Sequence, residues 1–222
     1  IKKRAHGQLA ARHSQDDEGE PQMDIFLVRH GETDWNLLGK MQGHQDIPLN
    51  KKGQQQAKEL ALKLREKQVD EIYSSTMKRA LETADIISRV LGKPAYMTEG
   101  LIEKGYGEAE GLTMAEANVK FADVMAAWME HPLNVKFPGE GSETDLEVLQ
   151  RVYGTWEEIL KRAKGNIVIV THGATMSILL QYLFRETPEE IPEHFGNVSI
   201  TTLRYSRLTE DLVLMGQEIL SK

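Results

Sequence analysis

The sequence predicts an α/β protein of three layers, in which a mostly parallel sheet carries helices on both faces. Short apolar runs alternate with amphipathic segments along most of the 222 residues, which is typical of parallel strands joined by crossover helices. The strongest apolar run, at 167–170, has the length of a strand and not of a membrane span. Because the chain contains no cysteine, its fold cannot depend on disulfides.

Residues 1–22 differ from the rest of the chain. Ile1 and Leu9 are the only large apolar residues in this segment, and its basic start leads into an acidic run at 16–20. A segment with so little to bury cannot offset the entropy that it would lose on ordering. We therefore expect residues 1–22 to be a disordered or vector-derived tail, with Met23 as the native start. Residues 23–222 are expected to form a single domain.

The first half of this domain is predicted to contain, in order, a strand at 24–28, a helix at 53–67, a strand at 71–73, a helix at 76–91 and a strand at 95–98. The first strand is apolar almost throughout, as expected of a strand covered on both faces. Each helix has apolar residues spaced three and four apart. The second helix should stop before Gly92 and Pro94.

The second half is predicted to contain a helix at 112–130, a helix at 143–164, a strand at 167–170, a helix at 174–184 and strands at 198–203 and 211–215. The stretch 101–141 interrupts the alternation of strands and helices. We expect it to form a small cap of helix and loop over one end of the sheet.

Reactive residues follow three of the predicted strands. Arg29 and His30 come directly after the first strand, and His172 comes after the strand at 167–170. Arg79 lies one helical turn beyond the strand that ends near Ser74. In open α/β sheets, ligands bind beyond the carboxyl ends of the strands. These side chains are therefore expected to meet at one edge of the sheet.

This set of residue types suits phosphoryl transfer. Arginine matches phosphate oxygens in pairs and stays charged, and a neutral histidine between two arginines can attack phosphorus. Helix starts after His30 and His172 would add backbone N–H donors, and Gly31 and Gly173 would allow close approach of the backbone. The same arginines would repel a metal cation from the histidines.

A carboxylic acid is also needed, to protonate the leaving group and then to activate water. The loop at 101–111 offers three candidates, Glu103, Glu108 and Glu110.

With these residues in this order, the sequence resembles the histidine phosphatase superfamily, the phosphoglycerate mutase-like proteins. The run Arg29-His30-Gly31-Glu32-Thr33 is similar to the signature of that family. Further matching blocks occur in family order from Met23 to Leu203: Trp35-Asn36, Gln42-Gly43, Asp46 to Leu49, Ser74-Ser75 with Arg79-Ala80, Leu101-Ile102-Glu103, Pro138 to Glu143 and Val170 to Gly173.

The resemblance implies roles for particular residues. His30 would be the nucleophile that becomes phosphorylated, held through its other ring nitrogen by a local carbonyl. Glu103 would be the proton donor, with Glu108 as its rival. The phosphate and substrate ligands would be Arg29, Asn36, Gln42, Gly43, Arg79, His172 and Gly173. The resemblance implies no metal and no organic cofactor.

The resemblance favours the phosphatase branch, because the stretch after Glu103 is short and lacks the basic-aromatic pattern of the mutases. We therefore expect a metal-independent phosphatase that acts on small phosphomonoesters through a phosphohistidine. Two alternatives remain open. One is a 2,3-bisphosphoglycerate-dependent phosphoglycerate mutase, and the other is a binding or regulatory module that keeps the fold without turnover.

The net charge of −7 argues against a broad surface for nucleic acid or anionic membrane. A small phosphomonoester is the expected partner. The missing cysteines fit a cytoplasmic protein. The resemblance also allows a homodimer.

Overall fold

The computed structural model describes residues 22–220, so the tail expected at 1–22 lies almost entirely outside the described residues. Its centre is a sheet with the strand order β3-β2-β4-β1-β5-β6. The strands are β1 (Gln22–Arg29), β2 (Val69–Ser75), β3 (Ala95–Thr98), β4 (Asn166–Thr171), β5 (Ile200–Ser206) and β6 (Leu212–Glu218). Pairing is parallel from β3 through β2 and β4 to β1, and antiparallel from β1 through β5 to β6. The predicted fold class is therefore confirmed.

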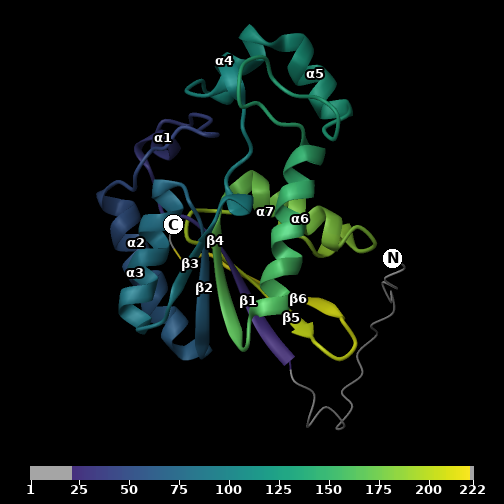
Figure 1. Cartoon of the computed structure of the whole chain (residues 1–222). Coiled ribbons are helices and arrows are strands. Elements are labelled where there is room, and N and C mark those ends of the chain that lie inside the picture. Colours follow the sequence, from purple (N-terminus) through teal and green to yellow (C-terminus); the bar gives the residue numbers. More distant parts are fainter. Residues whose placement is uncertain (1–21, 221–222) are drawn as a thin grey trace.

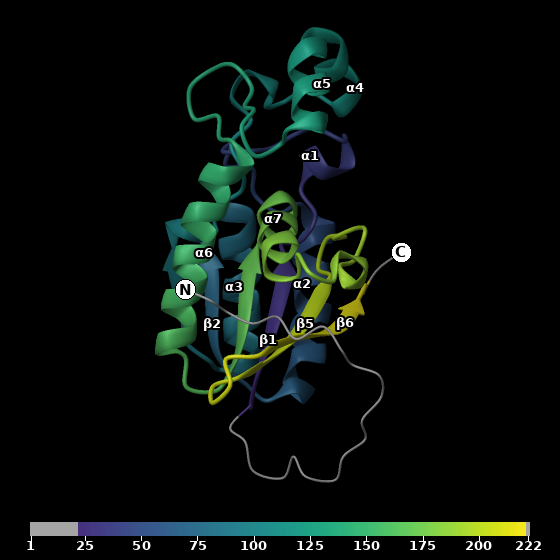
Figure 2. The same ribbon diagram turned by 90° about the vertical axis from the view of Figure 1, so that its right-hand side faces the viewer.

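Helices cover both faces of the sheet (Figure 1). One face carries α2 (Lys51–Leu64) and α3 (Lys78–Leu91), and the other carries α6 (Asp145–Arg162) and α7 (Gly173–Leu183), which stand in front of the sheet in Figure 2. Alternate residues of β1 explain why both faces are filled. Ile25 and Leu27 belong to the core beneath α6 and α7, whereas Phe26 and Val28 belong to the core beneath α2 and α3.

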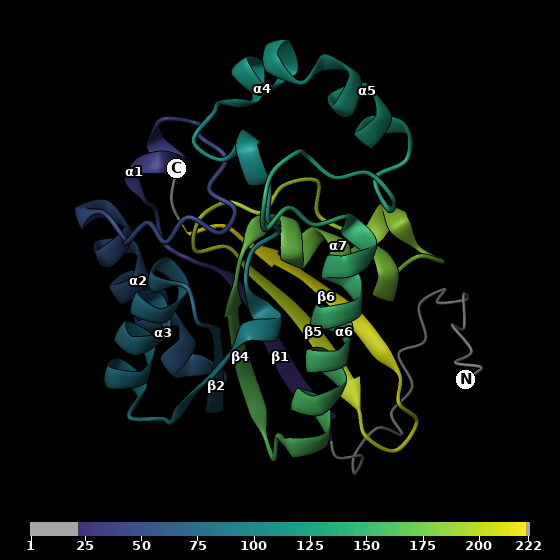
Figure 3. The same cartoon turned by 45° about the horizontal axis from the view of Figure 1, so that its top comes forward.

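The cap, residues 101–141, extends beyond the carboxyl ends of the parallel strands (Figures 1 and 3). Its small core contains Ala109, Ala117, Met125 and Phe137, all buried. The single helix predicted at 112–130 is wrong, because the structure has two helices here, α4 (Met114–Lys120) and α5 (Ala122–Glu130). The backbone leaves the helical region at Phe121 (φ −126°, ψ 41°), and its ring packs edge-on against Phe137. Tertiary packing thus overrides the helical pattern at this point.

Short elements account for the remaining differences. The helix α1 (Asp34–Leu37) has only four residues and is not predicted, since one turn carries no periodic signal. The short 3₁₀ helices are η1 (Arg65–Lys67), η2 (Glu99–Leu101), η3 (Gly107–Ala109) and η4 (Pro188–Glu190). Within residues 22–220, none of the helices is both long and apolar enough to cross a bilayer.

Candidate active site

Reactive side chains meet at the carboxyl ends of the parallel strands. They come from the ends of two neighbouring strands, β1 and β4, and from the helix that follows a third strand, β2. β1 ends at Arg29 and is followed by His30, while β4 ends at Thr171 and is followed by His172. The two imidazole rings lie 5.1 Å apart, measured between their centroids. Arg79 arrives from the start of α3, which follows β2, and its Nε donates to Nδ1 of His172 over 3.1 Å. We call Arg29, His30, Arg79 and His172 the strand-end pocket.

His30 is oriented by the adjacent backbone. Its Nδ1 lies 2.7 Å from the carbonyl oxygen of Gly31. Because a carbonyl oxygen only accepts, Nδ1 carries the proton and Nε2 carries the lone pair. Burial, together with the charges of Arg79 and Arg29, lowers the pKa of His30 well below its usual range. The ring is therefore neutral near pH 7, which is the state that a nucleophilic imidazole requires.

The two arginines are bonded in different ways. Arg79 is fully buried, and its terminal nitrogens donate to the carbonyl oxygens of Gln45 (2.8 Å) and Gly43 (2.9 Å). Arg29 donates to the carbonyl oxygen of Phe195, whereas its buried Nε has no hydrogen-bond partner within residues 22–220. Burial lowers the pKa of both groups, that of Arg79 to about 10, so both remain cations at neutral pH. A buried cationic N–H without a partner is suited to an incoming anion.

Both ring nitrogens of His172 have partners. Because the guanidinium of Arg79 only donates, Nδ1 of His172 accepts, so Nε2 carries the proton and donates to Oγ of Ser75 over 2.8 Å. Burial, followed by the charge of Arg79, lowers the pKa of His172 well below its usual range. In this arrangement His172 orients Arg79, and its only N–H is directed at Ser75, a residue for which the sequence predicts no role.

Glu103 lies at the N-terminal end of α7, the helix that begins directly after His172. Its carboxylate accepts hydrogen bonds from the backbone nitrogens of Ala174 (3.3 Å) and Thr175 (3.1 Å). The first N–H groups of α7 therefore hold the carboxyl group of Glu103 in place. The charge of Glu103 also raises the pKa of Arg29, against the larger effect of burial. The structure thus places Glu103 beside the strand-end pocket.

The other two carboxylates of this loop are engaged elsewhere. Glu108 is exposed, and its carboxylate lies 3.9 Å from the amine of Lys120 in α4. Glu110 accepts from the backbone nitrogens of His44 (2.9 Å) and Tyr106 (3.0 Å). Glu110 therefore fixes two loops against each other.

Lys104, the residue after Glu103, joins this loop to the helices α5 and α6. Its side chain is 1% exposed, and its amine forms an ion pair with Asp145 at the start of α6. The same amine lies 4.7 Å from the ring centre of Trp128 in α5 and 5.6 Å from that of Tyr106. The cation is enclosed and paired, so it links the loop to these two helices.

The predicted ligands Asn36 and Gln42 differ in their surroundings. The side-chain oxygen of Asn36 accepts from the backbone nitrogen of Thr33 (3.1 Å) and from the side chain of Asn197 (3.3 Å). Gln42 is buried, and its amide oxygen has no partner in the described part of the chain. Asn36 therefore supports the first turn of α1, while Gln42 keeps an acceptor available.

The predicted glycines differ as well. Gly43 has φ +50°, and a Cβ there would lie 2.0 Å from Oε1 of Glu110, so the position requires glycine. At Gly173 a Cβ would lie 3.5 Å from Nε of Arg29, which is an ordinary contact. Gly173 therefore lies beside Arg29, but close approach alone does not demand glycine there.

The expectation of a helix directly after His30 is wrong. α1 begins only at Asp34, and the N–H groups of Gly31 and Glu32 donate to side chains of α3 and α2. α7 does begin directly after His172, but a carboxylate already occupies its first N–H groups. At these two positions the donors for an anion are therefore side chains and not helix ends.

No pattern in the sequence indicates the turn at 195–198, which lies against the end of β1. The side chain of Asn197 donates to the carbonyl oxygen of His30 (3.0 Å), and the backbone nitrogen of Val198 donates to that of Arg29 (3.0 Å). Val198 has φ +53°, a strained value for a β-branched residue. The pair Gly196-Asn197 is typical of turns, but nothing in the local sequence connects it to His30.

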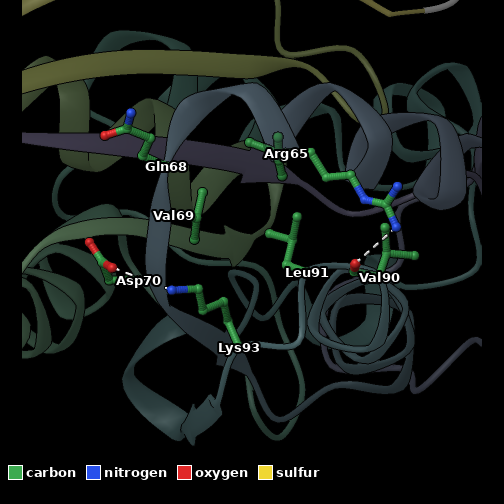
Figure 4. Close-up of a pocket in the computed structure, with 8 residues that line it drawn as sticks. Arg65, Gln68, Val69, Asp70, Val90, Leu91 and Lys93 are labelled. Carbon is green, nitrogen blue, oxygen red and sulfur yellow. Dashed lines mark hydrogen bonds and ion pairs between the residues drawn. The ribbon is translucent and has the colours of Figure 1, made fainter.

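Two surface hollows lie apart from the strand-end pocket. One, of about 350 Å³, lies between the end of α2, the start of β2 and the end of α3, at the amino end of β2 (Figure 4). There Lys93 pairs with Asp70 (3.4 Å), and Arg65 donates to the carbonyl oxygen of Val90 (3.3 Å). The other, of about 500 Å³, lies between α7 and the segment 188–193. Neither is lined by a residue of the strand-end pocket.

Comparison with known proteins agrees with this geometry. The profile of the histidine phosphatase superfamily (branch 1) matches residues 25–218. Phosphoglycerate mutase-like protein 4 of Arabidopsis thaliana is 37% identical over 75% of this chain and 73% of its own length. Phosphoserine phosphatase 1 of Hydrogenobacter thermophilus is 35% identical over 68% and 72%, respectively. A mycobacterial glucosyl-3-phosphoglycerate phosphatase, solved with VO3, superposes with a TM-score of 0.75 at 26% identity, covering 88% of this chain and 98% of that one.

The chain belongs to the histidine phosphatase superfamily. Together with the relatives that carry phosphatase names, this membership makes it a phosphoric monoester hydrolase.

Proposed function

We propose that this protein is a metal-independent phosphatase that hydrolyses small phosphomonoesters through a phosphohistidine on His30. One observation carries the proposal. A neutral imidazole, fixed through Nδ1 to the carbonyl of Gly31, carries its lone pair on Nε2 and lies close to the charges of the buried Arg79 and the partly buried Arg29. The unpartnered Nε of Arg29 supplies a donor for the phosphoryl oxygens.

In the first step, Nε2 of His30 attacks phosphorus and the bond from phosphorus to the ester oxygen breaks. Arg29 and Arg79 stabilise the charge on the equatorial oxygens as the phosphoryl group moves. Glu103, entering as the carboxylic acid, gives its proton to the departing alkoxide, which leaves as the alcohol. The products of this step are the alcohol and a phosphohistidine.

In the second step, water attacks the phosphohistidine and the bond between phosphorus and nitrogen breaks. The carboxylate of Glu103 takes a proton from the water, which restores the acid for the next cycle. Inorganic phosphate leaves, and His30 returns to its neutral form with the proton on Nδ1.

The charge of the pocket supports independence from metals. Arg29 and Arg79 flank both histidines, so a divalent cation would meet two fixed positive charges. We also propose that the free amide oxygen of Gln42 accepts a hydrogen bond from a hydroxyl or amino group of the substrate. Relatives are named for phosphoserine and for glucosyl-3-phosphoglycerate, which are both small polar phosphomonoesters. These names support a substrate of the same class.

The overall composition supports our proposals about the partners and the cellular location of the protein. With a net charge of −7 and no cysteine, the chain suits small-molecule substrates in the cytoplasm better than nucleic acid or an anionic membrane surface.

The test is to react the protein with a radiolabelled phosphomonoester in the presence of a chelator and to quench the reaction with alkaline detergent, which preserves a phosphohistidine. The wild type should give label that is stable to base and labile to acid. His30→Asn should give none, and His131→Asn, which changes an exposed histidine of the cap, should label normally. Label on another residue, or loss of activity with the chelator, would contradict the proposal.

The mutase alternative is separated by a second assay. With 3-phosphoglycerate and a trace of 2,3-bisphosphoglycerate, we expect release of phosphate to exceed isomerisation. Faster isomerisation would assign the mutase activity instead. If the chain forms no phosphohistidine with any substrate, it is the binding or regulatory module that keeps the fold without turnover.

A further inference from the structure

Glu103 lies on a loop, yet a proton donor has to be held within a fraction of an ångström of its working position. Residues 102–106 form neither helix nor strand. The backbone of this segment must therefore be fixed by contacts from elsewhere in the chain.

Arg151, in the middle of α6, provides the first set of contacts. Its terminal nitrogens donate to the carbonyl oxygens of Gly100 (3.2 Å), Ile102 (2.8 Å) and Glu103 (3.0 Å). Three backbone groups on and just before the candidate proton donor are thus bonded to one side chain. Arginine is suited to this task because its five N–H donors lie in one rigid plane.

Glu143, just before α6, completes the arrangement. It forms a two-point ion pair with Arg151, with distances of 2.8 and 2.9 Å. The same carboxylate accepts from the backbone nitrogen of Gly105 (2.9 Å), and the backbone nitrogen of Glu143 donates to the carbonyl of Gly105 (3.0 Å). Burial alone would raise the pKa of Glu143, but the hydrogen bonds from Arg151 and His44 outweigh it and lower the pKa well below its usual range. The loop is therefore held on both sides of Glu103.

His44 connects this arrangement to the strand-end pocket. Its Nε2 lies 3.1 Å from the carbonyl oxygen of Glu103 and 3.3 Å from the carboxylate of Glu143. The residues on either side of it, Gly43 and Gln45, supply the carbonyl oxygens that bond Arg79. One short segment thus contacts both the phosphate-binding arginine and the backbone of the candidate acid.

The packing leaves this loop little freedom. A Cβ at Gly105 would lie 1.9 Å from the carbonyl oxygen of Gly141. Because the two backbones are already in contact, the loop cannot shift toward the segment before α6. The bonds of Arg151 and Glu143, together with this backbone contact, determine where the Glu103 carboxyl lies.

We infer that Arg151 and Glu143 are positioning residues for proton transfer, which place the Glu103 carboxyl beside the strand-end pocket without touching substrate. The inference rests on the proposed function, since it assumes that Glu103 is the proton donor. A positioning role has a distinctive signature. Only poor leaving groups need the proton, so a misplaced acid slows alkyl phosphates far more than aryl phosphates.

The experiment compares single-turnover formation of the phosphoenzyme from an alkyl phosphate and from p-nitrophenyl phosphate. Arg151→Lys keeps the charge but loses the planar fork. We expect it to slow the alkyl reaction about 10- to 100-fold and the aryl reaction much less. The matched control is Arg204→Lys, which breaks the equivalent two-point pair with Asp24 at the far end of β1 and should leave both rates unchanged.

A double variant separates positioning from general weakening. In a Glu103→Gln background, Arg151→Lys should cause no further change in the ratio of alkyl to aryl rates, because the group through which it acts is gone. Equal slowing of both substrates by Arg151→Lys, or a further fall of the ratio in the double variant, would overturn the inference. Glu143→Gln, which keeps an acceptor for Gly105, gives the same test if Arg151→Lys does not fold.

The outcome also distinguishes the inference from the proposed function beneath it. If Glu103→Gln alone leaves the ratio unchanged, the role of Glu103 as proton donor is wrong. If Glu103→Gln lowers the ratio and neither Arg151→Lys nor Glu143→Gln does, the role of Glu103 stands and the positioning role is wrong.

Discussion

The strand-end pocket and the cap differ in how firmly their side chains are held. In the pocket, His30, Arg79 and His172 are at most 2% exposed, and each is bonded to backbone or to another pocket residue. In the cap, Val119 is 85% exposed and Met129 is 73% exposed, above a core of only four buried residues. The pocket draws on three strands of the main sheet, whereas the cap contains no strand of its own.

This difference separates two tasks of the molecule. Phosphoryl transfer requires fixed donors, since a pocket that reorganises during the reaction loses much of its stabilisation of charge. Recognition of the alcohol requires only a wall of suitable shape, which loops and short helices can supply. We therefore expect substitutions in the pocket to affect chemistry and stability together, and substitutions on the cap surface to affect neither strongly.

The largest expected effect is that of Arg79→Met. The change removes a phosphate-binding charge and leaves the carbonyl oxygens of Gly43 and Gln45 without their donor. We expect kcat/KM to fall about 1,000-fold or more, with a loss of stability of about 3 kcal/mol. Steady-state kinetics and urea denaturation measure the two losses. A stable variant with near-normal kcat/KM would show that the pocket is as tolerant as the cap.

Gly43→Ala should follow in size. Its Cβ would overlap the carboxylate of Glu110, which already bonds the backbone nitrogens of His44 and Tyr106. We expect a loss of about 2–4 kcal/mol in the free energy of unfolding. Gly39→Ala is the matched control, because Gly39 also has a positive φ (+66°) but has no atom within 4 Å of the added Cβ. It should cost about 1 kcal/mol, and equal losses at both positions would contradict the steric argument.

The pH dependence of stability gives an intermediate effect. The folded pKa values of His30 and His172 lie below the usual 6.5, so below that pH only the unfolded chain takes up these protons. Their contribution to stability is complete above pH 6.5 and is lost as the pH falls, by up to about 1.4 kcal/mol per pH unit for each group. The pKa of His44 is raised in the folded chain, so His44 has the opposite effect on stability as the pH falls, but it is one group against two.

Urea denaturation at pH 7.0, 6.0 and 5.5 tests this expectation above the range in which carboxylates titrate. The wild type should lose about 1 kcal/mol or more across this interval, and His30→Gln should lose clearly less. A slope that is unchanged in the variant would mean that His30 is not buried in its neutral form.

The smallest expected effect is that of Val119→Ser in the cap. Because this side chain is largely exposed, the free energy of unfolding should change by less than about 0.5 kcal/mol. The kcat for p-nitrophenyl phosphate should stay the same, since α4 lies away from the reacting atoms. A marked loss of kcat would break the distinction between the two regions and would point to a partner or a motion of the cap that involves α4.

The sequence is informative about the pocket because its chemistry follows strands with strong local signals. The apolar run before Arg29 and the run before His172 each predict a buried strand, and parallel strands bring their ends together. The turn that bonds His30 through Asn197, and the pairing of Arg151 with the Glu103 loop, depend on residues far apart in the chain. No local periodicity encodes such contacts, just as none encodes the break between α4 and α5 at 121.

The enclosure of Lys104 has a practical consequence for chemical labelling. Its amine lies against Trp128 of the cap and pairs with Asp145 of α6, so amine-reactive reagents have no access to it in the folded chain. Exposed lysines such as Lys78 would react at once, whereas Lys104 would react only after the contacts around it open, through movement of the cap or unfolding of the chain. The rate at which Lys104 is acylated, followed by mass spectrometry, therefore measures how often its surroundings open, and no probe has to be introduced.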